Sequence, residues 1–185
     1  MDQHSGAHPG DIRPTEDSAI PYANQVVTRS LATAGLMIIS WPLVGSLLFD
    51  SAGEVRTPWW PVVIVVWFTA VMVFHRITRA PRPRFNARFG SEYLQRAVMD
   101  AARHGEGPPD PGVRAAAGVL ACRSIEAAVG GVAVLVGVII TAFVWPRVPW
   151  LTASIVSTLL VVVFLLRARL GWRYLNVVHG RTGTA

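Results

Sequence analysis

Glu126 is the ionisable residue that comes nearest to a long apolar stretch of this chain. It lies three residues after Arg123, and this spacing brings both side chains to one face of a helix. We expect an ion pair at a helix end, with a proton-coupling carboxylate as the less favoured alternative. Ionisable groups inside a bilayer are costly and mark proton relays, and the apolar stretches contain none. The sequence therefore argues against a proton-driven pump.

The other residue types that carry chemistry form no recognised pattern. His75, His104 and His179 are scattered, without the His-x-x-x-His or His-Glu spacing of a metal site. No serine lies in a Gly-x-Ser-x-Gly sequence, and there is no glycine-rich phosphate loop. The single cysteine, Cys122, is expected to be a buried thiol, although a neighbouring arginine could make it more reactive. We predict no catalytic residue, no cofactor-binding residue and no metal ligand.

A short element occurs twice in the chain. ARFGSEYL spans 87–94 and ARLGWRYL spans 168–175, and they share Ala-Arg, a large apolar residue, Gly and Tyr-Leu. These two copies are our candidate functional surface, with candidate residues Arg88, Gly90, Tyr93, Arg169, Gly171 and Tyr174. The Arg-Phe-Gly-x-x-Tyr part of the first copy resembles the tail of membrane methyltransferases that act on isoprenylcysteine or phospholipid. The resemblance is confined to this element. It implies a methyl-donor pocket near Arg88, Tyr93, Arg173 and Tyr174.

Long apolar runs define the fold class. The chain is 52% hydrophobic with a mean hydropathy of +0.42, and its apolar residues cluster instead of alternating with polar ones. We predict an all-α integral membrane protein with four helices that cross the membrane, over about 31–49, 58–74, 113–145 and 149–166. The third begins in the cytoplasm, and its membrane-spanning part covers about 127–145. A short amphipathic helix is predicted over 91–104, because apolar residues recur there at spacings of three and four.

The predicted helices fall into two modules. Residues 1–28 are polar, rich in Pro and Gly and not periodic, so we assign them to a disordered cytoplasmic tail. The first two-helix module covers 29–104, a linker covers 105–112, the second two-helix module covers 113–178, and a tail covers 179–185. At the end of the linker, Asp110 and Pro111 predict an N-cap followed by proline at the first helical position.

Three sequence elements recur in the same order in both modules. RSLATAG at 29–35 matches RSIEAAVG at 123–130, RTPW at 56–59 matches RVPW at 147–150, and the Ala-Arg element follows each. Each module begins and ends at the same face, so we interpret them as parallel tandem repeats about an axis along the membrane normal. Residues 77–86 are then an insertion in the first module. The alternative is that arginine and tryptophan recur at membrane interfaces for generic reasons.

The distribution of arginine predicts the orientation in the membrane. All 17 basic residues are arginine, and with both termini inside only Arg56 and Arg147 fall in outer loops. The absence of lysine and the abundance of Ala, Val, Gly and Pro indicate a high-GC bacterial genome. We expect a multi-pass protein of the bacterial inner membrane with both termini cytoplasmic.

Two sets of residues are candidate interaction surfaces. Small residues at helical spacing let helix backbones approach closely, and they predict a helix-packing or oligomer face at Ala127, Gly130, Gly131, Ala133 and Gly137. A run of arginines predicts either contact with anionic lipid head groups or a plain orientation signal, at Arg76, Arg79, Arg82, Arg84 and Arg88. Nucleic acid is not an expected partner, because this run lies against the membrane and lacks a folded platform.

Three functions are compatible with these features. The favoured hypothesis is a non-catalytic accessory, scaffold or oligomerising subunit, which works with a second copy or another membrane subunit. The alternative is a carrier or channel for a neutral or lipid-like solute, working as a homo-oligomer and lined by Ser40, Ser46, Thr69, Thr141, Ser154 and Ser157. The third is a membrane-embedded enzyme of the methyltransferase kind. No cofactor is expected for the favoured hypothesis.

Overall fold

The computed structural model describes residues 20–50, 52–56, 58–79, 89–148 and 150–182, and its regular elements are five α-helices. They are α1 (Ala23–Leu48), α2 (Trp60–Thr78), α3 (Ser91–His104), α4 (Pro111–Val144) and α5 (Leu151–Thr182). All except α3 are long and apolar enough to cross a membrane. The predicted all-helical class with four candidate transmembrane helices is confirmed.

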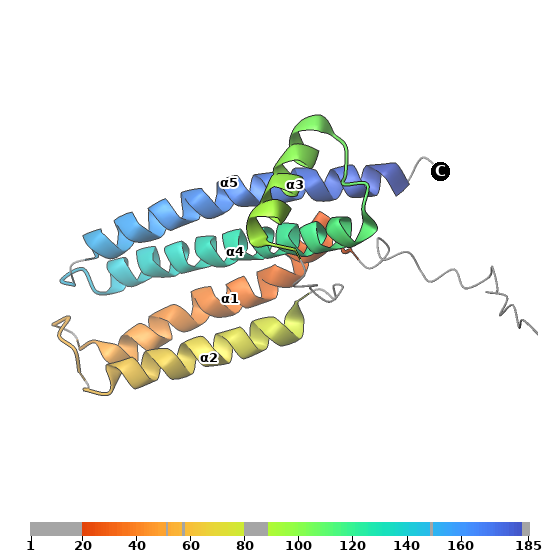
Figure 1. The fold of residues 1–185 in the computed structure, drawn as a ribbon. Coiled ribbons are helices and arrows are strands. Elements are labelled where there is room, and N and C mark those ends of the chain that lie inside the picture. Colours follow the sequence, from red (N-terminus) through yellow and green to blue (C-terminus); the bar gives the residue numbers. More distant parts are fainter. Residues whose placement is uncertain (1–19, 51, 57, 80–88, 149, 183–185) are drawn as a thin grey trace, which may run out of the picture.

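The four long helices lie side by side in a row, in the order α2, α1, α4, α5 (Figure 1). α1 and α4 run in the same direction, and α2 and α5 run back beside them. Two short loops close one end of the row, where the ring of Phe49 lies 6.4 Å from that of Trp145 and 5.9 Å from that of Trp150. We call this the loop end. The loop after α1 thus packs against the loop after α4.

The opposite end of the row carries a helical cap. It consists of residues 20–30, α3, residues 111–125 of α4 and residues 168–180 of α5. α4 has 34 residues and α5 has 32; at about 1.5 Å per residue each is roughly 50 Å long, against a hydrocarbon core of about 30 Å. The excess length builds the cap, whose core includes Leu94, Val98, Ala117, Cys122, Tyr174 and Leu175.

Between the cap and the loop end, the helices leave most of their apolar side chains uncovered. Ile39, Val65, Phe68, Leu159 and Leu166 are all exposed there. In water such a surface would be an aggregation liability, whereas surrounding hydrocarbon covers it at no cost. The well-buried core of the protein therefore lies in the cap, and the row itself is one helix thick.

Aromatic and polar contacts attach α2 to α1. The indole N–H of Trp67 donates to the Ser40 hydroxyl at 2.8 Å, and the Trp41 and Trp67 rings meet edge to face at 4.8 Å. Buried indole N–H groups need an acceptor, and Ser40 supplies one inside an apolar surrounding. Val71 is the buried side chain of α2, so these few contacts position this helix.

Two predicted boundaries are wrong. α1 begins at Ala23 and not near residue 31, and Ile20, Ala23 and Val26 are buried against the cap. Residues 20–28 therefore belong to the folded protein and not to a disordered tail. α5 does not end near 166 but continues to Thr182, because no proline interrupts it and Val178 is buried on its cap side. The rest of the predicted tails, 1–19 and 183–185, lies outside the described residues.

The turn into α4 follows its local sequence. The Asp110 carboxylate accepts a hydrogen bond from the backbone N–H of Gly112 at 2.8 Å, and Pro111 is the first helical residue. This N-cap is as predicted and satisfies one of the donors that a helix start leaves open. α3 ends on Gly105, whose φ of 72° lies in the left-handed region that glycine adopts without strain.

Candidate functional site

A polar cluster joins three helices at the boundary between the row and the cap. The Glu126 carboxylate of α4 lies 3.5 Å from Nε2 of His75 on α2. On the other side of that ring, Nδ1 lies 3.4 Å from the Thr33 hydroxyl of α1, which also lies 3.2 Å from the hydroxyl of Thr78. Glu126 and Thr33 are buried, and the His75 side chain is one-quarter exposed. The cluster links α2 to α4 past Thr33, in the first half of α1.

This cluster satisfies groups that would otherwise be costly to bury. A carboxylate removed from water needs a hydrogen-bonding or charged partner, and the imidazole of His75 provides one within reach. A carboxylate beside an imidazole can hold or pass a proton. In the part of the chain that the structure describes, no group of three His, Cys, Asp or Glu side chains could hold a metal ion.

The sequence pattern did not lead to the pairing of Glu126 with His75. The two residues lie on different apolar helices, and the local spacing instead pointed to Arg123 as the partner. Arg123 is exposed and Glu126 is buried in the structure, and the Arg123–Glu126 ion pair stays a prediction. The available signal was that Glu126 and His75 each stand at the charged end of an apolar run. Such residues share a depth in the membrane.

The two copies of the Ala-Arg element lie in different surroundings. In the first copy Arg88 lies outside the described residues, and Gly90 and Tyr93 are exposed at the start of α3. In the second copy Gly171 is buried in the contact between α4 and α5.

Tyr174, in the second copy, is fully buried. Its hydroxyl donates to the backbone carbonyl of Arg114 at 2.9 Å and ties α5 to α4. The counterpart Tyr93 is 56% exposed on α3. Arg169, also in the second copy, is exposed. The candidate residues of the two copies are therefore not gathered into one site.

The small residues of α4 serve different helix contacts. Gly137 faces Trp41 of α1, because a Cβ added there would lie 3.0 Å from the indole, and Gly131 faces Phe164 of α5 at the same distance. Ala133 is buried, Ala127 is exposed, and a Cβ on Gly130 would meet nothing within 4 Å. Gly131 and Gly137 thus lie in contacts with the two neighbouring helices of the row.

The predicted lipid-binding arginines lie partly outside the described residues. Arg76 is in the last turn of α2 and Arg79 is the residue that caps it, and both are exposed at the cap end. Arg82, Arg84 and Arg88 fall in the segment 80–88, which the structure does not describe.

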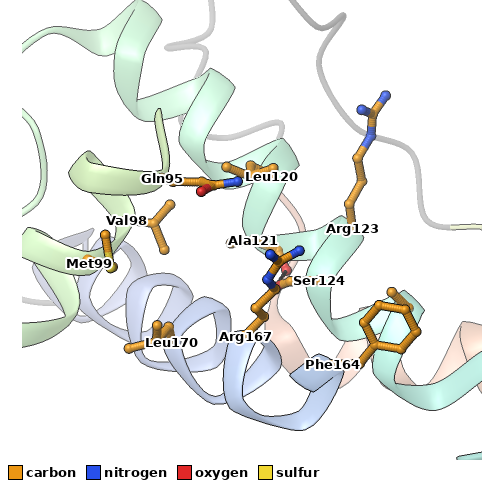
Figure 2. A pocket seen from close by; sticks show the side chains of 11 residues that line it. Gln95, Val98, Met99, Leu120, Ala121, Arg123, Ser124, Phe164, Arg167 and Leu170 are labelled. Carbon is orange, nitrogen blue, oxygen red and sulfur yellow. Dashed lines mark hydrogen bonds between the residues drawn. The ribbon is translucent and has the colours of Figure 1, made fainter. Parts of the chain in front are cut away.

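A pocket of about 290 Å³ opens between α3, α4 and α5 (Figure 2). Its walls are mainly apolar, and Arg167 of α5, Ser124 of α4 and Gln95 of α3 add polar atoms. Arg123 also belongs to its lining, although Figure 2 shows this side chain extending away from the others. The pocket lies at the level where the apolar stretch of α5 ends, since Arg167 is the first charged residue of that helix. No sequence pattern had pointed to this pocket.

A second, wider groove of about 500 Å³ lies between α1, α4 and α5. It is almost entirely apolar, with Arg169 and Trp172 of α5 among its lining residues. Residues 167 and 169 are about 200° apart on a helix, so one arginine lines each hollow. Both hollows have the composition of surfaces that contact lipid.

The residues of the other two functional hypotheses are not brought together around these hollows. Neither hollow is lined by the serines and threonines expected for a carrier, and neither is lined by Tyr93, Arg173 or Tyr174. The Thr141 hydroxyl instead donates to the carbonyl of Gly137 within its own helix at 2.7 Å.

Comparison with protein-family models, with curated proteins and with solved structures gives no match.

Proposed function

We propose that the protein is a non-catalytic, multi-pass membrane subunit, an accessory or scaffold protein that presents its helical cap to a partner. The observation that carries this proposal is the location of the packed core. The three largest fully buried side chains, Leu94, Tyr174 and Leu175, all lie in the cap, outside the apolar stretches. A bundle that served only to span the bilayer would not need an extra 20 Å or so of packed helix.

Polar side chains in the cap hold helices to one another. The Tyr174 hydroxyl binds the Arg114 carbonyl, and Nε2 of His179 lies 3.1 Å from the carbonyl of Ile20. The ring of Tyr22 lies 4.0 Å from that of His179. These contacts connect the start of α1 to α5 and make the cap rigid, which suits a docking platform.

We assign the cap to the cytoplasm of a bacterial cell, with the protein in the inner membrane. Exposed arginines occur throughout the cap end, whereas Arg56 and Arg147 stand at the loop end, and this asymmetry supports the orientation through the positive-inside tendency. We also propose that the two halves are parallel tandem repeats. The row order α2, α1, α4, α5 supports this, because matching helices then lie symmetrically about the α1–α4 contact.

The partner surface that we propose is the outer face of α3. Arg96 and Arg103 are exposed and seven residues apart, so they point in nearly the same direction. Glu92 and Asp100 are exposed on the same face, at helical spacings of three and four from these arginines, so the face alternates in charge. Such a face favours a partner subunit, or a second copy, with a complementary charge pattern.

Gentle extraction from the native membrane, followed by native mass spectrometry, tests the proposal. We expect another subunit or a second copy in fixed ratio, and we expect Arg96→Glu together with Arg103→Glu to release it. Arg56→Glu, a charge reversal at the loop end, is the matched control and should leave the assembly intact. A lone monomer from both the wild type and the control would overturn the proposal.

A further inference from the structure

The pocket between α3, α4 and α5 has the composition of an interfacial binding site. Its residues on the membrane side are Phe164 and Ala127, and farther from the membrane α3 contributes Val98 and Met99 and α5 contributes Leu170. Figure 2 shows Arg167 of α5 and Ser124 of α4 between these two apolar groups, so the polar atoms lie near the middle of the pocket. A molecule that enters from the bilayer and reaches Arg167 is therefore apolar where it passes Phe164 and polar where it meets the guanidinium.

Arg167 sets the charge of the ligand's polar end. Its guanidinium belongs to the pocket lining with the Ser124 hydroxyl and the Gln95 amide, and Figure 2 shows it beside Ser124 and Ala121 at the centre of the view. The Ser124 hydroxyl donates to the Ala121 carbonyl at 2.7 Å, so its oxygen is held in place. A guanidinium presents several N–H donors in a planar fork, a geometry that matches the oxygens of a phosphate.

The spacing along α5 matches the dimensions of a lipid. Phe164 precedes Arg167 by three residues, which is about 4.5 Å along the helix axis. A phosphate held by the guanidinium would thus have the first carbons of its acyl chain level with the Phe164 ring. Arg167 also stands at the polar boundary of the apolar stretch, the depth at which the phosphates of a bilayer lie.

We propose that this pocket binds one anionic phospholipid of the surrounding leaflet, with the phosphate on Arg167 and an acyl chain against Phe164 and Ala127. The occupant comes from the bilayer, because the mainly apolar walls would gain nothing from a free phosphate. This site differs from the arginine run at 76–88, and it needs no protein partner. The proposal therefore stands or falls separately from the scaffold function.

Native mass spectrometry of the full chain, with matched-chain phosphatidylglycerol or phosphatidylcholine added to the detergent, tests the site. We expect one retained phosphatidylglycerol per chain and weaker retention of phosphatidylcholine. Arg167→Gln should lower phosphatidylglycerol retention about fivefold, from the electrostatic contribution of one arginine near the surface. Arg173→Gln is the matched control, because Arg173 is exposed on the same helix but is not part of this lining.

Phe164→Ala provides a second test that leaves the charge unchanged. We expect it to lower retention of both lipids, and the thermal midpoint of each variant in lipid-free detergent shows whether it is folded. Equal loss in Arg167→Gln and Arg173→Gln would overturn the proposal, since it would indicate diffuse charge attraction. Equal retention of the two lipids by the wild type would overturn it as well. Displacement of the lipid by glycerol phosphate alone would point to a free-phosphate site and also refute it.

Discussion

Gly171 tests the close packing between α4 and α5. A Cβ added at this position would lie 2.8 Å from the carbonyl oxygen of Ala121 and 3.2 Å from its Cα. These are backbone atoms of a long helix and cannot rotate away as a side-chain end would. Gly171→Ala must therefore push the two helices apart or distort one of them.

The expected change in the free energy of unfolding combines two opposing contributions. Overpacking in a well-packed core costs about 1–3 kcal/mol, and replacing glycine by alanine inside a helix returns up to about 1 kcal/mol. For a chain of 185 residues, a net loss near 1–2 kcal/mol lowers the unfolding midpoint by roughly 2–8 °C.

Gly90 is a matched control, because it stands at the corresponding position of the first Ala-Arg element. A Cβ there would meet nothing within 4 Å, and the backbone φ of −63° accommodates alanine. Gly90 is the N-cap of α3, where glycine is preferred to alanine, so Gly90→Ala should cost at most about 1 kcal/mol and less than Gly171→Ala. The measurement is thermal unfolding of both variants in one detergent, followed by tryptophan fluorescence. Unchanged midpoints for both variants, or a larger loss for Gly90→Ala, would refute the close α4–α5 contact.

Two further predictions concern hydrogen bonds between helices and use the same melting assay. Tyr174→Phe should cost about 1 kcal/mol, because it removes a buried hydroxyl that donates across α4 and α5; Tyr93→Phe, at an exposed position, should cost nothing measurable, and equal effects would contradict this role of Tyr174. Glu126→Ala and His75→Ala should each destabilise the protein but add incompletely when combined, with a coupling of about 0.5–3 kcal/mol. If the losses of stability in the two single variants simply add up in the double variant, Glu126 and His75 contribute no interaction energy.

Local sequence signals predicted the helices well. A membrane-spanning helix is recognised from the length and uninterrupted apolarity of a single stretch of sequence. For this reason α2 and α4 were expected almost where they lie. The Asp110 cap at the start of α4 is equally local. The predicted start of the first helix was wrong, because that region is stabilised by residues distant in the sequence. Ile20, for example, packs on Gly118, about a hundred positions along the chain.

The candidate site was less predictable, because it depends on which helices become neighbours. Glu126 was recognised as exceptional from its position, but its contact with His75 follows from the row order and not from spacing. The pocket around Arg167 needs α3 to lie across α4 and α5. Periodicity identifies the apolar face of α3 but not the surface that this face covers.

The position of α3 also explains why two similar sequence elements have different surroundings. In the second half the Ala-Arg element continues α5 without a break, so Gly171 packs tightly on α4. In the first half residues 77–86 separate the element from the apolar stretch of α2, and α3 forms as an independent helix. It packs on α4 and α5 and not on its own half of the row.

The third wall of the Arg167 pocket is therefore contributed by the first half of the chain to the second. The row itself is held by contacts among the four long helices, so the pocket depends on the packing of α3 whereas the row does not.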